Sequence, residues 1–296
     1  RRLPALGALA ALAALALTAA LSPLAAQRTP RCSTEGEVAR LPHHLEETSG
    51  AAVSIADPRL VWTHNDSGHE AELFALTLDG SVEGRVELDA PALDWEDIAV
   101  ARCAAGACVY VADTGDNLEA RTSVSILRLP EPDPHEHTTA HAQVFPVRLP
   151  DGPRDVEALF VLPGERVYLV SKGRNHPATV YRYPGPLRPD TVTLVEVQKL
   201  SQGPLAPPRM VTGADASLDG SRVLVRTYQS LHIYRWDAEA GRLAGVPRGE
   251  IDLRSLAEPQ GEGVAVGRSG RVILTSEGHR GHRPLLTVLR CEGPGF

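Results

Sequence analysis

The stretch EDIAVARCAAGACVYVADTGDN, residues 96–117, holds two short apolar runs joined by a tight turn and ends in acidic and amide side chains. Short apolar runs on either side of a glycine-containing turn are typical of a β-hairpin. The same layout occurs four more times in the chain, with a small or acidic residue before the first run and a polar pair after the second. A recurring unit of this kind indicates a repeat architecture.

The spacing of the five copies predicts the fold. Their opening residues are separated by 47, 61, 55 and 50 positions and are Ser49, Glu96, Glu157, Thr212 and Glu262. The polar pairs begin 17, 17, 14, 14 and 14 positions later, at Asp66, Asp113, Ser171, Arg226 and Ser276. Further apolar strands follow each hairpin, and four antiparallel strands per repeat describe a blade of a β-propeller. We predict an all-β propeller with five blades, or with six if residues 131–141 or 185–208 contain strands.

The last copy predicts how the ring closes. After its hairpin it shows only one more strand, PLLTVLR at residues 284–290, so we expect residues 36–42 at the other end of the chain to complete that blade. Cys103 and Cys108 bracket a tight turn and suggest a local disulfide, which leaves Cys32 to pair with Cys291. A zinc site is the alternative, but the spacing of the cysteines and histidines does not favour it.

The first residues resemble an export signal. Two arginines precede a long Ala/Leu run that ends in small residues, so we predict a signal peptide over residues 1–26 and a single propeller domain over residues 27–296. A retained membrane anchor is the alternative. The signal and the even number of cysteines together predict a secreted or periplasmic protein without stable membrane insertion after cleavage.

Composition limits the partners. The formal net charge of −7 disfavours nucleic acid as a partner, because phosphate binding needs a basic surface. Gly and Pro make up 26 and 24 residues, which favours many turns over long helices. We expect a monomer that takes a small molecule or an ion.

The repeat also predicts where polar side chains meet. The start of the first strand and the end of the second lie side by side in a hairpin, and the first strand of each blade lines the channel of a propeller. We therefore expect a shared channel mouth formed by Ser49, Asn65, Asp66, Glu96, Asp97, Asp113, Asp116, Asn117, Glu157, Lys172, Thr212, Arg226, Glu262 and Glu277. Crowded carboxylates require protonation, ion pairs with Lys172 and Arg226, or a bound cation.

Several of these segments carry a resemblance to known proteins. SGAAVS, WTHNDSG, DWEDIAV, YVADTGDN, RDVEAL, VTGADASLDG and GEGVAV are similar to the blades of uncharacterised secreted bacterial propellers. These in turn resemble phytase-like and esterase-like propellers and, more distantly, gluconolactonase and paraoxonase-type ones. The resemblance covers residues 47–277 and implies a channel calcium ion held by Glu96, Glu157, Glu262, Asp113 and Asn117. Ser49 and Thr212 depart from such a ring, and inward-pointing Lys172 or Arg226 would repel a metal.

Two hypotheses about function follow. The first is a secreted binding protein whose channel mouth takes a ligand or an ion. The second is a calcium-dependent hydrolase of a phosphoester or lactone, in which the cation polarises the substrate oxygen and an acid or a histidine at the mouth transfers protons. A polar ring with a purely structural role is the alternative to both, since Asp, Ser and Gly also form turns after strands.

Overall fold

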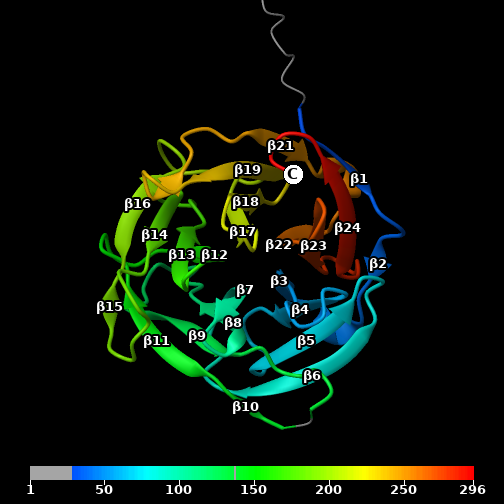
Figure 1. Ribbon diagram of the computed structural model, residues 1–296, viewed down its shortest axis with the longest axis horizontal. Helices are drawn as coiled ribbons and strands as arrows, with labels where there is room; N and C mark the ends of the chain where they lie inside the picture. Colours follow the sequence, from blue (N-terminus) through cyan, green and yellow to red (C-terminus); the bar gives the residue numbers. More distant parts are fainter. Residues whose placement is uncertain (1–28, 137) are drawn as a thin grey trace, which may run out of the picture.

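The computed structural model describes residues 29–136 and 138–296 and shows a five-bladed β-propeller (Figure 1). The predicted signal peptide lies outside the described residues. Five inner strands surround a central channel, and each is the first strand of an antiparallel blade. The predicted fold and the blade number of five are therefore confirmed. In the described part of the chain, no helix is long and apolar enough to span a membrane.

The first two blades each have four main strands and a short fifth strand at the rim. Blade 1 consists of β3 (Thr48–Val53), β4 (Leu60–Asn65), β5 (Glu72–Thr77), β6 (Val82–Asp89) and β10 (Ala140–His141). Blade 2 consists of β7 (Trp95–Cys103), β8 (Gly106–Asp113), β9 (Val124–Pro130), β11 (Gln143–Arg148) and β15 (Val192–Thr193).

The remaining three blades follow the same order from channel to rim. Blade 3 consists of β12 (Val156–Leu162), β13 (Arg166–Ser171), β14 (Thr179–Arg182) and β16 (Val195–Lys199). Blade 4 consists of β17 (Val211–Ala216), β18 (Arg222–Thr227), β19 (Ser230–Asp237), β20 (Arg242–Leu243) and β21 (Gly249–Asp252). Blade 5 consists of β22 (Gln260–Val266), β23 (Arg271–Glu277), β24 (Leu285–Glu292), β1 (Arg31–Thr34) and β2 (Ala39–Arg40). Two 3-10 turns, η1 (His43–Leu45) and η2 (Arg254–Leu256), precede the inner strands of blades 1 and 5.

The two long connections contain strands but form no sixth blade. Each supplies a short strand that pairs in parallel with the outer strand of the preceding blade: β10 with β6, and β15 with β11. The sequence pattern TVTLVEVQKL, residues 191–200, suggests one strand, yet its first part joins blade 2 and its second part joins blade 3. Blade 2 is thus tied at the rim to blade 1 through β10 and to blade 3 through β15.

The N-terminal segment closes the ring, with boundaries that differ from the prediction. The strand expected at residues 36–42 starts at Arg31 and is divided into β1 and β2, both antiparallel to β24 (Figure 1). Gly36 interrupts it with a left-handed φ of +80°. Cys32 is the register partner of Cys291 and forms a disulfide with it, and Cys103 pairs with Cys108, so both predicted disulfides are confirmed.

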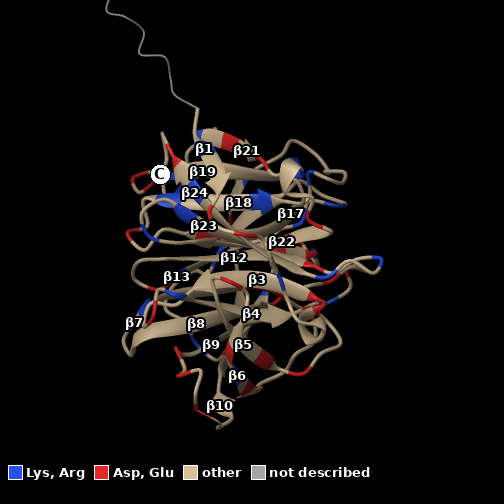
Figure 2. Cartoon of the chain, turned by 90° about the vertical axis from the view of Figure 1, so that its right-hand side faces the viewer, with Lys and Arg blue, Asp and Glu red and all other residues tan. Residues whose placement is uncertain are grey.

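The core is divided among the gaps between blades. Each of five apolar clusters contains residues from two adjacent blades. Trp62 of blade 1 and Trp95 of blade 2 are almost fully buried in one of them, where each large apolar side chain contributes about 2–3 kcal/mol through the hydrophobic effect. Middle strands are buried on both faces, which explains their nearly continuous apolar sequences. In the side view, Lys and Arg are interspersed with Asp and Glu along the outer strands (Figure 2).

Candidate functional site: an acidic channel mouth

A register shift occurs at the same place in all five inner strands. The pairing with the second strand is interrupted between Thr48 and Ala51, Trp95 and Asp97, Val156 and Ala158, Val211 and Gly213, and Gly261 and Val264. Every opening residue of the repeat therefore lies in a β-bulge. A bulge leaves one residue without a pairing partner and changes the direction of its side chain. The side chains of the opening residues therefore need not follow the alternation of the strand.

The bulged glutamates belong to a carboxylate cluster at one end of the channel. Its members come from all blades except blade 4 or from the segments beside them, and are Glu47, Asp66, Asp94, Glu96, Asp155, Glu157, Glu262 and Glu277. Lys172 lies among them and Tyr228 borders them from blade 4. We call these ten residues the acidic mouth. It contains six of the predicted mouth residues: Asp66, Glu96, Glu157, Lys172, Glu262 and Glu277.

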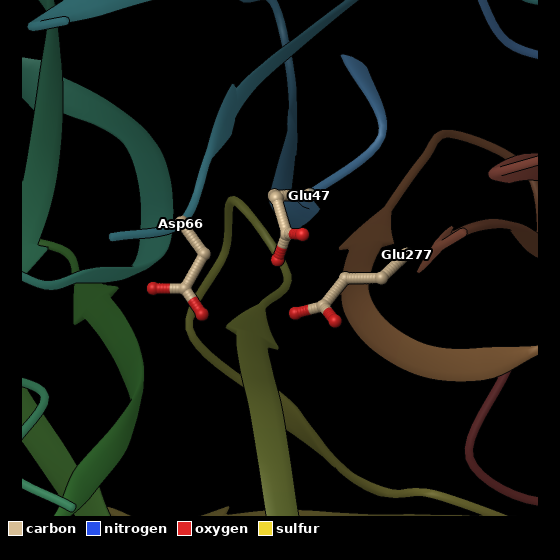
Figure 3. Close-up of side chains that lie close together, drawn as sticks. All are labelled: Glu47, Asp66 and Glu277. Atoms are coloured by element: carbon tan, nitrogen blue, oxygen red, sulfur yellow. The ribbon is translucent and has the colours of Figure 1, made fainter. Parts of the chain in front are cut away.

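Three overlapping groups of carboxylates have geometry suited to a metal ion. Within each group, one oxygen of every member lies within 4.8 Å of the others. Triad A is Glu47, Asp66 and Glu277; triad B is Asp66, Asp94 and Glu96; triad C is Glu96, Asp155 and Glu157. Figure 3 shows triad A, where three carboxylates from separate segments point toward one another.

Triad C already contains a positive charge. The Nζ atom of Lys172 lies 2.5 Å from Oε1 of Glu157 and 3.7 Å from Oδ2 of Asp155. Asp155 also accepts a hydrogen bond from Arg174 at 2.9 Å. Burial disfavours the ammonium ion, but the neighbouring carboxylates, chiefly that of Glu157, outweigh it and raise the pKa of Lys172, which favours the ammonium form at neutral pH. Burial also raises the pKa of Glu157, and the charge of Lys172 opposes that rise.

The carboxylates of triads A and B have perturbed protonation. Burial, with the neighbouring charges of Asp94 and Glu47, raises the pKa of Asp66 to about 7. Burial and the charge of Asp66 raise the pKa of Glu277 to about 8. The pKa of Glu96 rises well above its ordinary value through burial and the charges of Glu157 and Asp66. Glu96 is 5% exposed, and among the described residues no hydrogen-bond donor reaches its carboxylate. In the protein alone the protonated forms of Glu96 and Glu277 are favoured at neutral pH, whereas Asp66 is divided between its protonated and ionised forms.

Among the other predicted mouth residues, Ser49 and Thr212 join neighbouring blades, whereas Asn65 contacts the segment that precedes its own blade. The Ser49 hydroxyl donates to the Glu96 carbonyl of the next blade at 2.6 Å, and Thr212 donates to the Glu262 carbonyl at 3.1 Å. Asn65 donates to the His44 carbonyl at 2.8 Å. Their short polar side chains bridge backbone groups at the bulges, which matches the structural reading of the ring.

Asp97 and Arg226 are both buried and have partners of their own. Asp97 accepts backbone N–H groups from blades 2, 3 and 4. Arg226 donates to the carbonyls of Gly263 and Thr275 and pairs with Glu258 at 2.5 Å. Arg226 therefore does not neutralise the acidic mouth; Lys172 alone of the two predicted cations does so.

The motif DTGDN has a divided role. Asp113 pairs with Arg121 at 3.0 Å and accepts the Asp94 N–H at 3.1 Å. Asp116 accepts backbone N–H groups of its own loop at Ala120 and Arg121. The exposed Asn117 accepts a hydrogen bond from Arg174 at 2.6 Å. None of these three side chains belongs to triads A, B or C, although the resemblance implies Asp113 and Asn117 as ligands.

Gly115 of the same motif makes room for triad B. A Cβ atom at this position would lie 2.0 Å from Oε1 of Glu96 and 2.5 Å from Oδ2 of Asp94. The glycine therefore packs its backbone directly against two of the three carboxylates. Sequence reasoning assigned importance to the acids of this motif, whereas the structure places the glycine nearest to the cluster.

Glu47, Asp94, Asp155 and Tyr228 were not predicted from the sequence. A signal for the three acids exists: each lies two positions before an opening residue, at Glu47-x-Ser49, Asp94-x-Glu96 and Asp155-x-Glu157. Each of these acids lies just before the inner strand begins, so this spacing before the opening residue could have identified them. Tyr228 follows β18 with no comparable pattern.

The comparisons with known proteins support the fold. No family model and no curated protein sequence matches the chain. The PQQ-bound aldose sugar dehydrogenase of Streptomyces coelicolor is similar in structure, with a TM-score of 0.53 at 10% identity over 89% of this chain and 99% of that one. A gluconolactonase of Xanthomonas campestris has a TM-score of 0.46 at 13% identity over 90% and 99% of the two chains. At 10% identity the likeness to the dehydrogenase shows the β-propeller fold alone, and the chemistry has to be argued from the acidic mouth itself.

Proposed function

We propose that this protein is a cation-binding β-propeller whose acidic mouth takes a divalent metal ion at triads A and B. The observation that carries the proposal is the convergence of carboxylates from three blades, Glu47 and Asp66 of blade 1, Asp94 and Glu96 of blade 2 and Glu277 of blade 5. Asp66 belongs to both triads. The buried Glu96 adds a carboxylate that lacks a donor among the described residues.

Electrostatic repulsion gives the physical reason. Two carboxylates 4.8 Å apart repel by about 3 kcal/mol at an effective dielectric constant of about 20. Three such pairs approach the whole stability of an ordinary domain, about 5–15 kcal/mol. The groups must therefore be protonated or share a cation, and a divalent ion neutralises the repulsion while all carboxylates stay ionised.

Calcium fits the donor set best. Triads A and B offer only carboxylate oxygens, with no His or Cys among their members. Calcium accepts six to eight oxygen ligands in flexible geometry, whereas softer metals prefer nitrogen or sulfur. The bulged strands and loops that carry these side chains come from separate blades, so the oxygens can adjust to an ion of this size.

Thermal unfolding with calcium and with a chelator tests the proposal. A cation that binds only the folded protein stabilises it by about 2.7 kcal/mol at a concentration 100 times its Kd. We expect the melting temperature in calcium to exceed that in chelator by roughly 5–10 °C, given about 2–4 °C per kcal/mol for a chain of this size.

A matched pair of variants locates the effect. Asp66→Asn alters both triads at once and should remove most of the calcium-dependent shift. Asp190→Asn makes the same chemical change at an exposed position in the connection before β15, and should keep it. Equal melting temperatures in calcium and chelator for the unaltered protein would refute the proposal, and an undiminished shift in Asp66→Asn would place the ion elsewhere.

A calcium-dependent hydrolase is the second candidate. It is favoured by Glu262, a buried carboxyl of the acidic mouth that belongs to none of the three triads. The pKa of Glu262 rises well above normal through burial and the charges of Glu277 and Glu157. A group held as an acid at neutral pH can donate a proton to a leaving oxygen. A bound cation would supply polarisation of the substrate oxygen. The test is hydrolysis of a panel of lactones and phosphoesters in the presence of calcium. Hydrolysis that is lost in Glu262→Gln, while calcium still stabilises the variant, would support this candidate. Absence of any hydrolysis by the unaltered protein would eliminate it.

A further inference from the structure

Triad C differs from triads A and B in two respects: all three of its members are buried, and it contains a side-chain cation. In triad C, Glu157 and Asp155 lie within 4.0 Å of the Lys172 ammonium, and Asp155 also meets Arg174. Among the described residues, no Lys, Arg or His nitrogen comes within that distance of Glu47, Asp66, Asp94, Glu96 or Glu277. Triads A and B are formed by the same kind of groups at the same spacing, and they lack this partner.

The backbone holds Lys172 in place at both of its polar groups. Its N–H donates to the carbonyl of Asp155 at 2.9 Å, and its carbonyl accepts from the N–H of Val211 at 3.0 Å. These bonds join the end of β13 to the start of β12 and to blade 4. The side chain is nearly buried, so its ammonium ion is a fixed part of the mouth and not a mobile surface charge.

We propose that Lys172 is a tethered cation that occupies triad C and so excludes a metal ion from it, which confines metal binding to triads A and B. The inference rests on the proposed cation-binding function and specifies which part of the mouth is open to the ion. An ammonium ion and a metal ion cannot share the oxygens of Glu157 and Asp155, because like charges at contact distance repel strongly. Lys172 is thus a residue that sets the number and the position of bound ions.

Removing the ammonium tests this directly. Lys172→Met keeps the length of an unbranched side chain and deletes the charge. We expect equilibrium dialysis followed by elemental analysis to find one more calcium ion per chain in Lys172→Met than in the unaltered protein. Lys172→Arg retains a cation in triad C and should bind the unaltered number. Adding Asp155→Asn to Lys172→Met should remove the gained ion.

The outcomes separate this inference from the proposed function. Equal numbers of ions, one or more, in the unaltered protein and in Lys172→Met overturn the inference and leave the function standing. No ion in the unaltered protein and one in Lys172→Met refutes the function but supports the role of Lys172. No ion in either refutes both.

Loss of folding in Lys172→Met would also give a result. Without the ammonium, Glu157 and Asp155 repel each other, and calcium in triad C would relieve that repulsion. The inference then requires that Lys172→Met shows the near-ultraviolet circular dichroism of the folded protein in calcium. In chelator, the variant should remain unfolded. A variant that stays unfolded in calcium, together with a folded Lys172→Met/Glu157→Gln variant that gains no ion, would overturn it.

Discussion

The carboxylate of Asp97, on the inner strand of blade 2, accepts a hydrogen bond of 3.1 Å from the backbone N–H of Ala214 on the inner strand of blade 4. The same oxygen accepts the N–H of Leu159 on blade 3 at 2.8 Å, and the other oxygen accepts the N–H of Ile98 at 2.9 Å. One side chain therefore ties together the inner strands of three blades inside the channel. It is fully buried and separate from the three triads.

We expect Asp97→Ala to destabilise the protein without weakening cation binding. The change leaves buried N–H groups without acceptors, each costing about 1–3 kcal/mol, so a loss of roughly 3–5 kcal/mol in the free energy of unfolding is expected. Urea unfolding measures it. The calcium-dependent rise in melting temperature should persist in the variant; its disappearance would show that Asp97 contributes to the cation site as well.

The two disulfides should contribute very differently to stability. Cys32 and Cys291 are 259 positions apart and join β1 to β24, whereas Cys103 and Cys108 are five apart in one hairpin. Chain entropy predicts about 5 kcal/mol for the long closure and about 2 kcal/mol for the short one. Replacing both cysteines of one bridge by serine gives two variants, Cys32→Ser/Cys291→Ser and Cys103→Ser/Cys108→Ser. Urea unfolding measures the free energy that each variant loses. Equal losses would mean that ring closure relies on strand pairing alone.

Gly115→Ala separates the cation site from the stability of the fold. The added methyl group would displace the Glu96 and Asp94 carboxylates, which are the flexible ends of their side chains. We expect a change in unfolding free energy of less than about 1 kcal/mol, because surrounding side chains can move aside, but a calcium-dependent melting shift reduced by half or more. Gly185→Ala, at a position with no atoms within 4 Å of the new methyl group, is the control. A full shift in Gly115→Ala would exclude triad B from the site.

Calcium should stabilise the protein more at pH 8 than at pH 5. The pKa values of Asp66 and Glu277 rise from 3.8 and 4.5 to about 7 and about 8 in the folded protein. The folded state without calcium thus holds protons that the unfolded chain has released, and its stability falls as pH rises from about 4 to 8. Calcium competes with those protons and removes the repulsion that appears at high pH.

The measurement is the difference in melting temperature between calcium and chelator at each pH. This difference cancels the opposite effect of His64, whose pKa falls to about 4 through burial, so that it lowers stability in acid with and without calcium. A shift that is equal at pH 5 and pH 8 would mean that protons do not compete with the ion, which contradicts the assignment of Asp66 and Glu277.

Some features of the site follow from local sequence and others do not. The spacing of the hairpins was enough to predict that Glu96, Glu157 and Glu262 lie at a common mouth, because the start and the end of a hairpin are adjacent. Arg226 occupies the same repeat position as a mouth residue, yet its guanidinium lies buried against Gly263, Thr275 and Glu258. The repeat separates the two cations by one position, since Lys172 is the second residue of its polar pair and Arg226 is the first. The partners of Arg226, in contrast, depend on which backbone carbonyls the neighbouring blade presents.

The sequence by itself determined the repeated antiparallel blades and the pairing of the four cysteines, because alternation, turns and spacing are properties of short segments and their order. It left the blade number at five or six. The tertiary structure alone decided the bulge at every opening residue, the sharing of residues 192–199 between two blades, and the distribution of carboxylates among triads A, B and C. Those features arise where separate blades meet, and the energy of a carboxylate there depends on burial and on charges contributed by distant parts of the chain.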